Sequence, residues 1–302
     1  MKLLQDLINI YAPSGDEIRM KEFLINYVKE NAANWKVQPE VLTEGMQDCL
    51  MLKFGKPRTA IFAHMDSIGF TVRYGNELVK IGGPKTISGS ILYGYDSKGY
   101  IEAELEVGEI EKLSYKAERL IDPGTALCFK SDFRETEEYV QSCYMDNRLG
   151  IYNALKVAET LEDGVLVFSC WEEDGSGSVA YLARILHDQL GVSQALISDI
   201  TWVTEGVKHG KGVAISLRDR MIPRQAFVRK IIAEAEKAKV SYQLEVEDAG
   251  GSDGHILQRS PYPFDWCFIG APEDNVHSPD EKVHKADILA MTKLYQHLMK
   301  VL

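Results

Sequence analysis

The sequence predicts an α/β protein with a mixed, mostly parallel sheet flanked by helices and an inserted small all-β domain. Short apolar runs alternate with stretches whose apolar residues recur every three or four positions. This alternation is typical of a parallel sheet covered by helices on both faces. Between residues 73 and 139, glycines and short β-like runs dominate instead. We therefore expect a main domain of residues 1–72 and 140–302 and a small β insert of residues 73–139.

The first segment combines two helices with the first strands of the sheet. Residues 2–11 have helical periodicity, and Ser14-Gly15-Asp16-Glu17 is a start signal for a second helix over residues 18–28. The strands expected next cover residues 41–54 (around a turn), 58–63 and 68–72.

The insert contains an antiparallel pattern. Apolar residues at 101, 103, 105 and 107 alternate with glutamates at 102, 104 and 106. A strand with one buried and one solvated face has this alternation. The insert therefore differs from the α/β layer on either side of it.

After the insert, the alternation of strands and helices resumes. Right-handed crossovers between parallel strands bring the strand exits to one edge of a sheet. The expected helices cover residues 148–161, 178–190, 226–238 and 286–302, and the expected strands cover residues 165–171, 195–198, 213–217, 242–246 and a short stretch around 268–269.

The strand over residues 165–171 ends in two adjacent carboxylates, Glu172 and Glu173. Two ionised carboxylates at one strand exit repel each other, so a positive charge must lie between them or one must hold a proton. Open α/β sheets bind their ligands outside these strand ends. The pair is therefore interpreted as one metal ligand beside one general base. The alternative is a solvated pair that opens the next helix, where carboxylates favour the helix dipole.

Other imidazole and acidic groups are expected at the same edge of the sheet. A lone histidine is usually a packed or surface residue, and an aspartate at a helix start is usually a cap. Their joint placement favours a metal site, and histidines with carboxylates and no thiolate suit zinc, cobalt or manganese. These groups are His64 and Asp66 after the strand over 58–63, Asp146 before a helix, Asp199 after the strand over 195–198, and His277 in a late turn.

Composition argues against several functions. The net charge of -11 argues against a nucleic-acid partner. The N-terminus breaks at Pro13 and lacks the apolar core of a signal peptide, and no run of 18 apolar residues could span a membrane. Five scattered cysteines without a CxxC pair are typical of reduced thiols. We expect a cytoplasmic protein that binds neither nucleic acid nor membrane.

Five motifs in order resemble those of metallopeptidase family 42, the glutamyl aminopeptidases, which include the tetrahedral aminopeptidases and proteins labelled endoglucanase. The resemblance extends over nearly the whole chain, from the first helix to the last. The motifs are HMDSIGF at 64–70, MDNRLG at 145–150, WEEDG at 171–175, SD at 198–199 and VHSP at 276–279.

The resemblance implies two divalent metal ions, most readily zinc, with cobalt or manganese as alternatives. His64, Asp146 and Asp199 would hold one ion, and Asp146, Glu173 and His277 the other, with Asp146 bridging. Glu172 would be the general base, and Asp66 would orient His64 as the second catalytic carboxylate. The family also implies a cis peptide bond between Asp146 and Asn147.

Departures from the family pattern concern specificity more than chemistry. Asp174 follows the glutamate pair where the family usually has valine, and its charge is expected to disfavour acidic substrates. Ser252, Asp253 and His255 lie in a Gly-rich segment that resembles a substrate-binding loop of the family, although an ordinary Gly/Asp turn has the same pattern.

The leading hypothesis is a metal-dependent aminopeptidase that acts on short peptides and forms a homo-oligomer, from a dimer up to a dodecamer. In the family the β insert builds oligomers and gates substrate access. Two alternatives remain: a metal-dependent deacylase or amidase on the same fold, and a non-catalytic, metal-stabilised oligomeric scaffold.

Overall fold

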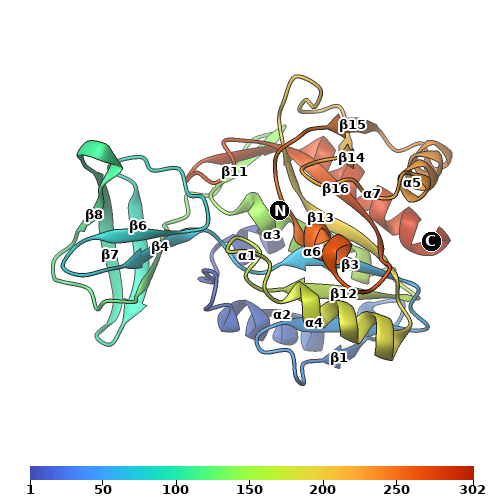
Figure 1. Cartoon of the computed structure of the whole chain (residues 1–302), viewed down its shortest axis with the longest axis horizontal. Coiled ribbons are helices and arrows are strands. Elements are labelled where there is room, and N and C mark those ends of the chain that lie inside the picture. Colours follow the sequence, from blue (N-terminus) through green and yellow to red (C-terminus); the bar gives the residue numbers. More distant parts are fainter.

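A computed structural model describes residues 1–302, apart from the side chain of Glu111. The chain forms an eleven-stranded sheet covered by helices and a separate six-stranded sheet. Figure 1 shows the six-stranded sheet at one end of the molecule, away from the helices. The structure confirms the predicted α/β class with an additional small β unit.

The elements follow one another in a βα alternation that the six-stranded sheet interrupts. The helices are α1 (Lys2–Ile8), α2 (Ile18–Asn31), η1 (Ala32–Asn34), η2 (Glu109–Glu111), α3 (Met145–Ala158), α4 (Val179–Arg184), continued by the π-helical turn η3 (Ile185–Gln189), α5 (Gln225–Ala238), α6 (Asp253–Arg259) and α7 (Lys285–Val301). The strands are β1 (Glu40–Leu42), β2 (Leu50–Phe54), β3 (Thr59–His64), β4 (Gly69–Val72), β5 (Leu78–Ile81), β6 (Ile91–Asp96), β7 (Gly99–Val107), β8 (Leu113–Lys116), β9 (Ala126–Phe129), β10 (Arg134–Glu135), β11 (Tyr139–Ser142), β12 (Gly164–Ser169), β13 (Gln194–Trp202), β14 (Val213–Arg218), β15 (Tyr242–Val246), β16 (Asp265–Asp274) and β17 (Glu281–His284).

Four parallel strands, in the order β12-β3-β13-β16, form the centre of the large sheet. Strands β3 and β12 are buried along their whole lengths, as expected for apolar runs covered on both faces. Helix α3 packs against β3, β13 and α7, whereas α6 packs against β13, β16 and α4. The register places His64 beside Ser169, so the two strands end side by side.

The six-stranded sheet is entirely antiparallel, in the order β5-β4-β9-β6-β7-β8. In β7, Ile101, Ala103 and Leu105 are buried and the glutamates between them are exposed, which confirms the predicted alternation. Strand β4 belongs to this sheet, whereas β10 and β11 pair within the large sheet. The division of the chain into domains at residues 72/73 and 139/140 stays a prediction.

Strands β13 and β16 are both longer than the sequence predicts. Strand β13 continues to Trp202 because β16 pairs with it residue by residue from Asp265 to Glu273. Asp199 therefore lies within β13, opposite Gly270, and not at the exit of a four-residue strand. The apolar run predicts only the part of a strand that is buried on both faces, whereas backbone pairing extends it.

No helix in the described part of the chain is long and apolar enough to cross a membrane.

Candidate metal centre

Two groups of imidazole and carboxylate side chains meet at the edge of the large sheet. In each group the possible ligand atoms lie within 4.8 Å of one another, and Asp146 belongs to both. The first group is His64, Asp146 and Asp199, and the second is Asp146, Glu173 and His277. The structure thus brings together the five residues that the sequence resemblance names as ligands.

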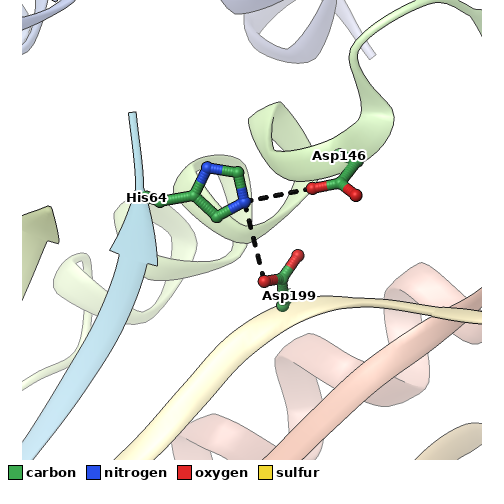
Figure 2. A group of neighbouring side chains, drawn as sticks. All are labelled: His64, Asp146 and Asp199. Atoms are coloured by element: carbon green, nitrogen blue, oxygen red, sulfur yellow. Dashed lines mark hydrogen bonds and ion pairs between the residues drawn. The ribbon is translucent and has the colours of Figure 1, made fainter. Parts of the chain in front are cut away.

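The first group joins three elements of the core. His64 ends β3, Asp146 lies at the start of α3, and Asp199 lies within β13 (Figure 2). Nε2 of His64 is 3.0 Å from Oδ1 of Asp146 and 3.7 Å from Oδ2 of Asp199. One imidazole nitrogen therefore faces two carboxylates from two different elements.

The second group lies on the other side of the Asp146 carboxylate. Nε2 of His277 is 3.3 Å from Oδ2 of Asp146 and 3.2 Å from Oε2 of Glu173. Oε1 of Glu173 is buried and has no hydrogen-bond partner among the described side chains. A buried carboxylate oxygen without a donor is costly, and a metal ion would compensate it.

The electrostatics of the cluster are those of a site that needs positive charge. Burial raises the pKa of Asp199 well above its usual range, and the nearby charge of Asp146 adds to this. Burial alone would lower the pKa of His277, but its contacts with Asp146 and Glu173 raise it to about 12. Divalent cations would balance the negative charge of these carboxylates, with neutral imidazoles as further ligands. The residues therefore fit a two-metal site.

Glu172 belongs to neither ligand group, although its Oε2 is 3.9 Å from Nε2 of His64. Burial raises the pKa of its carboxyl well above the usual range. The neighbouring Glu173 carboxylate reinforces this shift. Glu172 is therefore a largely buried carboxyl group beside the cluster whose environment strengthens its affinity for a proton.

Asp66 holds the glutamate pair in place through the backbone. Its Oδ1 accepts the N–H of Glu172 at 3.0 Å, and its Oδ2 accepts the N–H of Glu173 at 3.1 Å and the hydroxyl of Ser14 at 2.6 Å. Oδ1 also lies 3.3 Å from Nδ1 of His64. Asp66 thus touches both the imidazole and the glutamate turn, and it is a positioning residue.

Glu281 connects the segments that carry Asp146 and His277. This fully buried carboxylate accepts the N–H of His277 at 2.9 Å and the N–H of Met145 at 2.6 Å. The sequence analysis missed Glu281 because a glutamate after a proline turn has no distinguishing pattern. The residue lies four positions after His277 and begins β17, and that spacing is the only signal that could have found it.

The backbone at Asp146 has the predicted cis peptide bond to Asn147. The Asn147 amide donates to the carbonyl of Ser198 at 2.9 Å, and its Oδ1 accepts the N–H of Gly150 at 2.8 Å. These bonds tie the start of α3 to β13, so Asp146 and Asp199 are positioned relative to each other by backbone contacts as well as side chains.

A cavity of about 260 Å³ opens onto this cluster and onto Glu172. From the Gly-rich loop, Gly250 and Gly251 line it, whereas Ser252, Asp253 and His255 are not among its described lining residues. Ser252 instead caps α6 by accepting the N–H of Gly254, and Asp253 accepts the hydroxyl of Ser169. Their role in substrate binding stays a prediction.

The far wall of the cavity contains carboxylates that the sequence analysis did not single out. These are Asp219, Glu245 and Glu247. They follow β14 or belong to β15 and its exit, and only the pairing of these two strands brings them together.

The chain is similar to known proteins in sequence and in fold. A curated protein of Acetivibrio thermocellus with a provisional aminopeptidase name is 26% identical over 97% of this chain and 96% of its own length. The fold matches the TET1 peptidase of Pyrococcus horikoshii with a TM-score of 0.85 and 22% identity, over 100% of this chain and 99% of that one. It also matches the aminopeptidase APDkam598 of Desulfurococcus kamchatkensis with a TM-score of 0.88 and 20% identity, over 99% and 93% of the two chains.

The family model of the M42 glutamyl aminopeptidases matches residues 105–294, which is more than half of the chain. This range includes four of the five cluster residues, all except His64. The chain therefore belongs to the M42 glutamyl aminopeptidase family, and it is a peptidase hydrolase.

Proposed function

We propose that this protein is a dinuclear metal-dependent aminopeptidase that releases N-terminal residues from short peptides, with Glu172 as the general base. The observation that carries the proposal is a largely buried carboxyl group, Glu172, beside two ligand groups that share Asp146. A purely structural metal site has no need of such an additional acid. His64 and Asp199 would hold one ion, Glu173 and His277 the other, and Asp146 would bridge them.

Two divalent ions, zinc in the first place and cobalt or manganese as alternatives, would supply Lewis acidity toward a water molecule and the scissile carbonyl. Glu172 takes a proton from the attacking water and returns it to the leaving amine. Burial of Glu172 suits this exchange because it raises the affinity of the carboxylate for the proton. Asp66 holds the backbone of Glu172 in position by accepting its N–H.

We further propose a cytoplasmic homo-oligomer in which the β insert of residues 73–139 contributes to assembly and substrate access. The P. horikoshii TET1 peptidase can assemble into a tetrahedron or a large octahedral shell. Large apolar side chains on the insert support an interface here, among them the exposed Tyr74, Ile87 and Leu120. The five cysteines are unpaired and buried, in agreement with a reducing compartment.

The test is hydrolysis of aminoacyl-p-nitroanilides after EDTA treatment and re-addition of Zn²⁺, Co²⁺ or Mn²⁺, with wild type and Glu172→Gln compared. We expect metal to restore activity and the substitution to reduce it by a factor of about 10²–10⁴, the usual contribution of a general base. Glu172→Gln should still bind metal, as measured by calorimetry. Metal binding without any hydrolysis would instead favour a deacylase, tested with N-acyl amino acids, or a scaffold.

A further inference from the structure

The cavity beside the candidate metal centre is acidic beyond the residues assigned to metal and base. Asp219, Glu245 and Glu247 line its far wall, and no lysine or arginine is among its described lining residues. Two divalent ions would offset the charge of the four carboxylates at the centre. The three carboxylates of the far wall would remain without such compensation.

The position of Glu245 relates this wall to the centre. Its carboxylate accepts the hydroxyl of Thr201, which is two residues beyond Asp199 on β13. Side chains two apart on a strand point to the same face and are roughly 6–7 Å apart along it. Glu245 therefore contacts β13 on the same side as Asp199, two residues further along the strand.

Two of the three far-wall carboxylates, those of Glu245 and Glu247, lack basic partners within the described structure. Glu245 and Glu247 form no ion pair with any described lysine or arginine, although Glu245 is almost fully buried. Arg218, the adjacent guanidinium in β14, donates to the backbone carbonyls of Asp219 and Glu247 instead. Burial raises the pKa of Glu245, as expected for a carboxylate held away from a counter-charge.

Asp219 differs from the other two carboxylates because it has an imidazole partner. Nε2 of His255 lies 3.1 Å from its Oδ1, and both side chains are buried. His255, which the sequence analysis placed in a substrate loop, thus contacts Asp219 without lining the cavity itself.

Apolar residues line the cavity as well. They are Ile200, Trp202, Phe268 and Val276. Lysine and arginine bury their aliphatic stems along apolar surface while the charged ends reach polar groups. A cavity with both apolar and acidic lining residues suits such a side chain, whereas a glutamate side chain would meet like charge.

We propose that this cavity selects peptides whose N-terminal residue is lysine or arginine, with Glu245 and Glu247 receiving the cationic end and Asp219 adding to the negative field. This inference rests on the proposed aminopeptidase function. A basic preference is a departure from the glutamyl activity for which the family is named.

The test compares kcat/KM of the metal-loaded enzyme for Lys-, Arg-, Leu- and Glu-p-nitroanilide in wild type, Glu245→Gln and Glu247→Gln. We expect wild type to prefer Lys and Arg over Leu at least tenfold and to cleave Glu least. Each substitution should lower the Lys/Leu ratio several-fold, and Glu247→Lys should raise the Glu/Lys ratio. Asp248→Asn, an exposed neighbour outside the cavity wall, is the matched control and should leave the ratios unchanged.

Equal losses on all four substrates would overturn the proposal, because these acids would then recognise the α-amino group that every substrate shares. A wild type that prefers Leu or Glu would overturn it as well.

A binding measurement separates this inference from the proposed function. Calorimetry of the metal-loaded protein with L-lysine hydroxamate and L-leucine hydroxamate needs no turnover. Tighter binding of the lysine compound, lost in Glu245→Gln and Glu247→Gln, would support the charge preference even if no substrate were hydrolysed. Hydrolysis without any difference between the two compounds would leave the aminopeptidase intact and refute the preference.

Discussion

The carboxylate of Glu281 accepts the backbone N–H of His277 at 2.9 Å, while its other oxygen accepts the N–H of Met145. His277 has a positive φ of 64°, and Tyr144, just before Met145, has one of 66°. Both segments thus hold conformations that most residues avoid. One buried side chain fixes them relative to each other, and with them two of the three ligands of the second proposed metal ion.

Replacing Glu281 should therefore weaken metal binding without removing a ligand. Glu281→Gln replaces one of the two acceptor oxygens with an NH₂ group, which cannot accept a hydrogen bond from a backbone N–H. We expect metal affinity to fall about 10–100-fold, the usual effect of losing a residue that orients metal ligands through hydrogen bonds. Competition with a chelator measures this. Asp280→Asn, which alters the neighbouring half-exposed carboxylate, should have no effect, and unchanged affinity in Glu281→Gln would show that the two segments hold their positions without it.

Metal removal should destabilise the fold. Without cations the buried carboxylates of the centre repel one another, and ions that bind only the folded state stabilise it by mass action. At 100 times the dissociation constant this amounts to about 2.7 kcal/mol for one site. Thermal unfolding with EDTA and with added Zn²⁺ should show a higher Tm with metal. In Asp146→Asn, which changes the shared ligand, most of the difference should vanish; a metal-dependent shift as large as that of wild type would argue against the bridging role.

Glu17 should make the stability depend on pH. Burial raises the pKa of its carboxyl from 4.5 to about 7. The folded state then binds the proton more tightly than the unfolded state, so the stabilising effect is complete below pH 4.5 and is lost as pH rises through 7. The loss amounts to about 3 kcal/mol at most. Urea unfolding of EDTA-treated protein should show Glu17→Gln gaining stability relative to wild type between pH 5 and pH 8.

A matched control for Glu17 lies on the same helix. Glu22 is exposed on α2, and Glu22→Gln should keep a constant stability difference from wild type over this range. A constant difference for Glu17→Gln as well would mean that the buried carboxyl group titrates alike in the folded and unfolded states.

Gly150 should not tolerate a methyl group, although it lies in a helix. Alanine normally stabilises a helix by about 1 kcal/mol relative to glycine. Here a Cβ would collide with the carbonyl oxygen of Ser198 and with Oδ1 of Asn147. We expect Gly150→Ala to destabilise the protein by about 1–3 kcal/mol, as overpacking does, and to lower activity because α3 carries Asp146. Gly206→Ala, with open space around the glycine, should unfold like wild type in the same denaturant titration.

The sequence predicted the centre of the fold because its strands carry a strong local signal. Strands β3 and β12 are mainly apolar runs. His64 is the last residue of β3, and the glutamate pair begins three residues after the end of β12. Strands buried on both faces need such runs, and parallel pairing brings their ends together. The length of β13 was not predictable, because its second half is defined by pairing with β16 and not by its own composition.

The far wall of the cavity could not be predicted for a related reason. Glu245 belongs to β15, which pairs only with β14 in the large sheet. In the sequence it stands among alternating polar and apolar residues, as any half-exposed strand does. Its side chain contacts Thr201, which lies on a strand far away in the sequence. The residues around Glu245 do not indicate this contact.

The order of the strands in the large sheet has a consequence for biosynthesis. Strand β3 is made early, but both strands that flank it, β12 and β13, are made much later, and His277 follows β16 near the end of the chain. A ribosome must therefore synthesise the chain at least as far as His277 before the proposed hydrolytic centre can form. We expect chains that stop before His277 to carry no peptidase activity, because they lack a ligand of the second proposed ion.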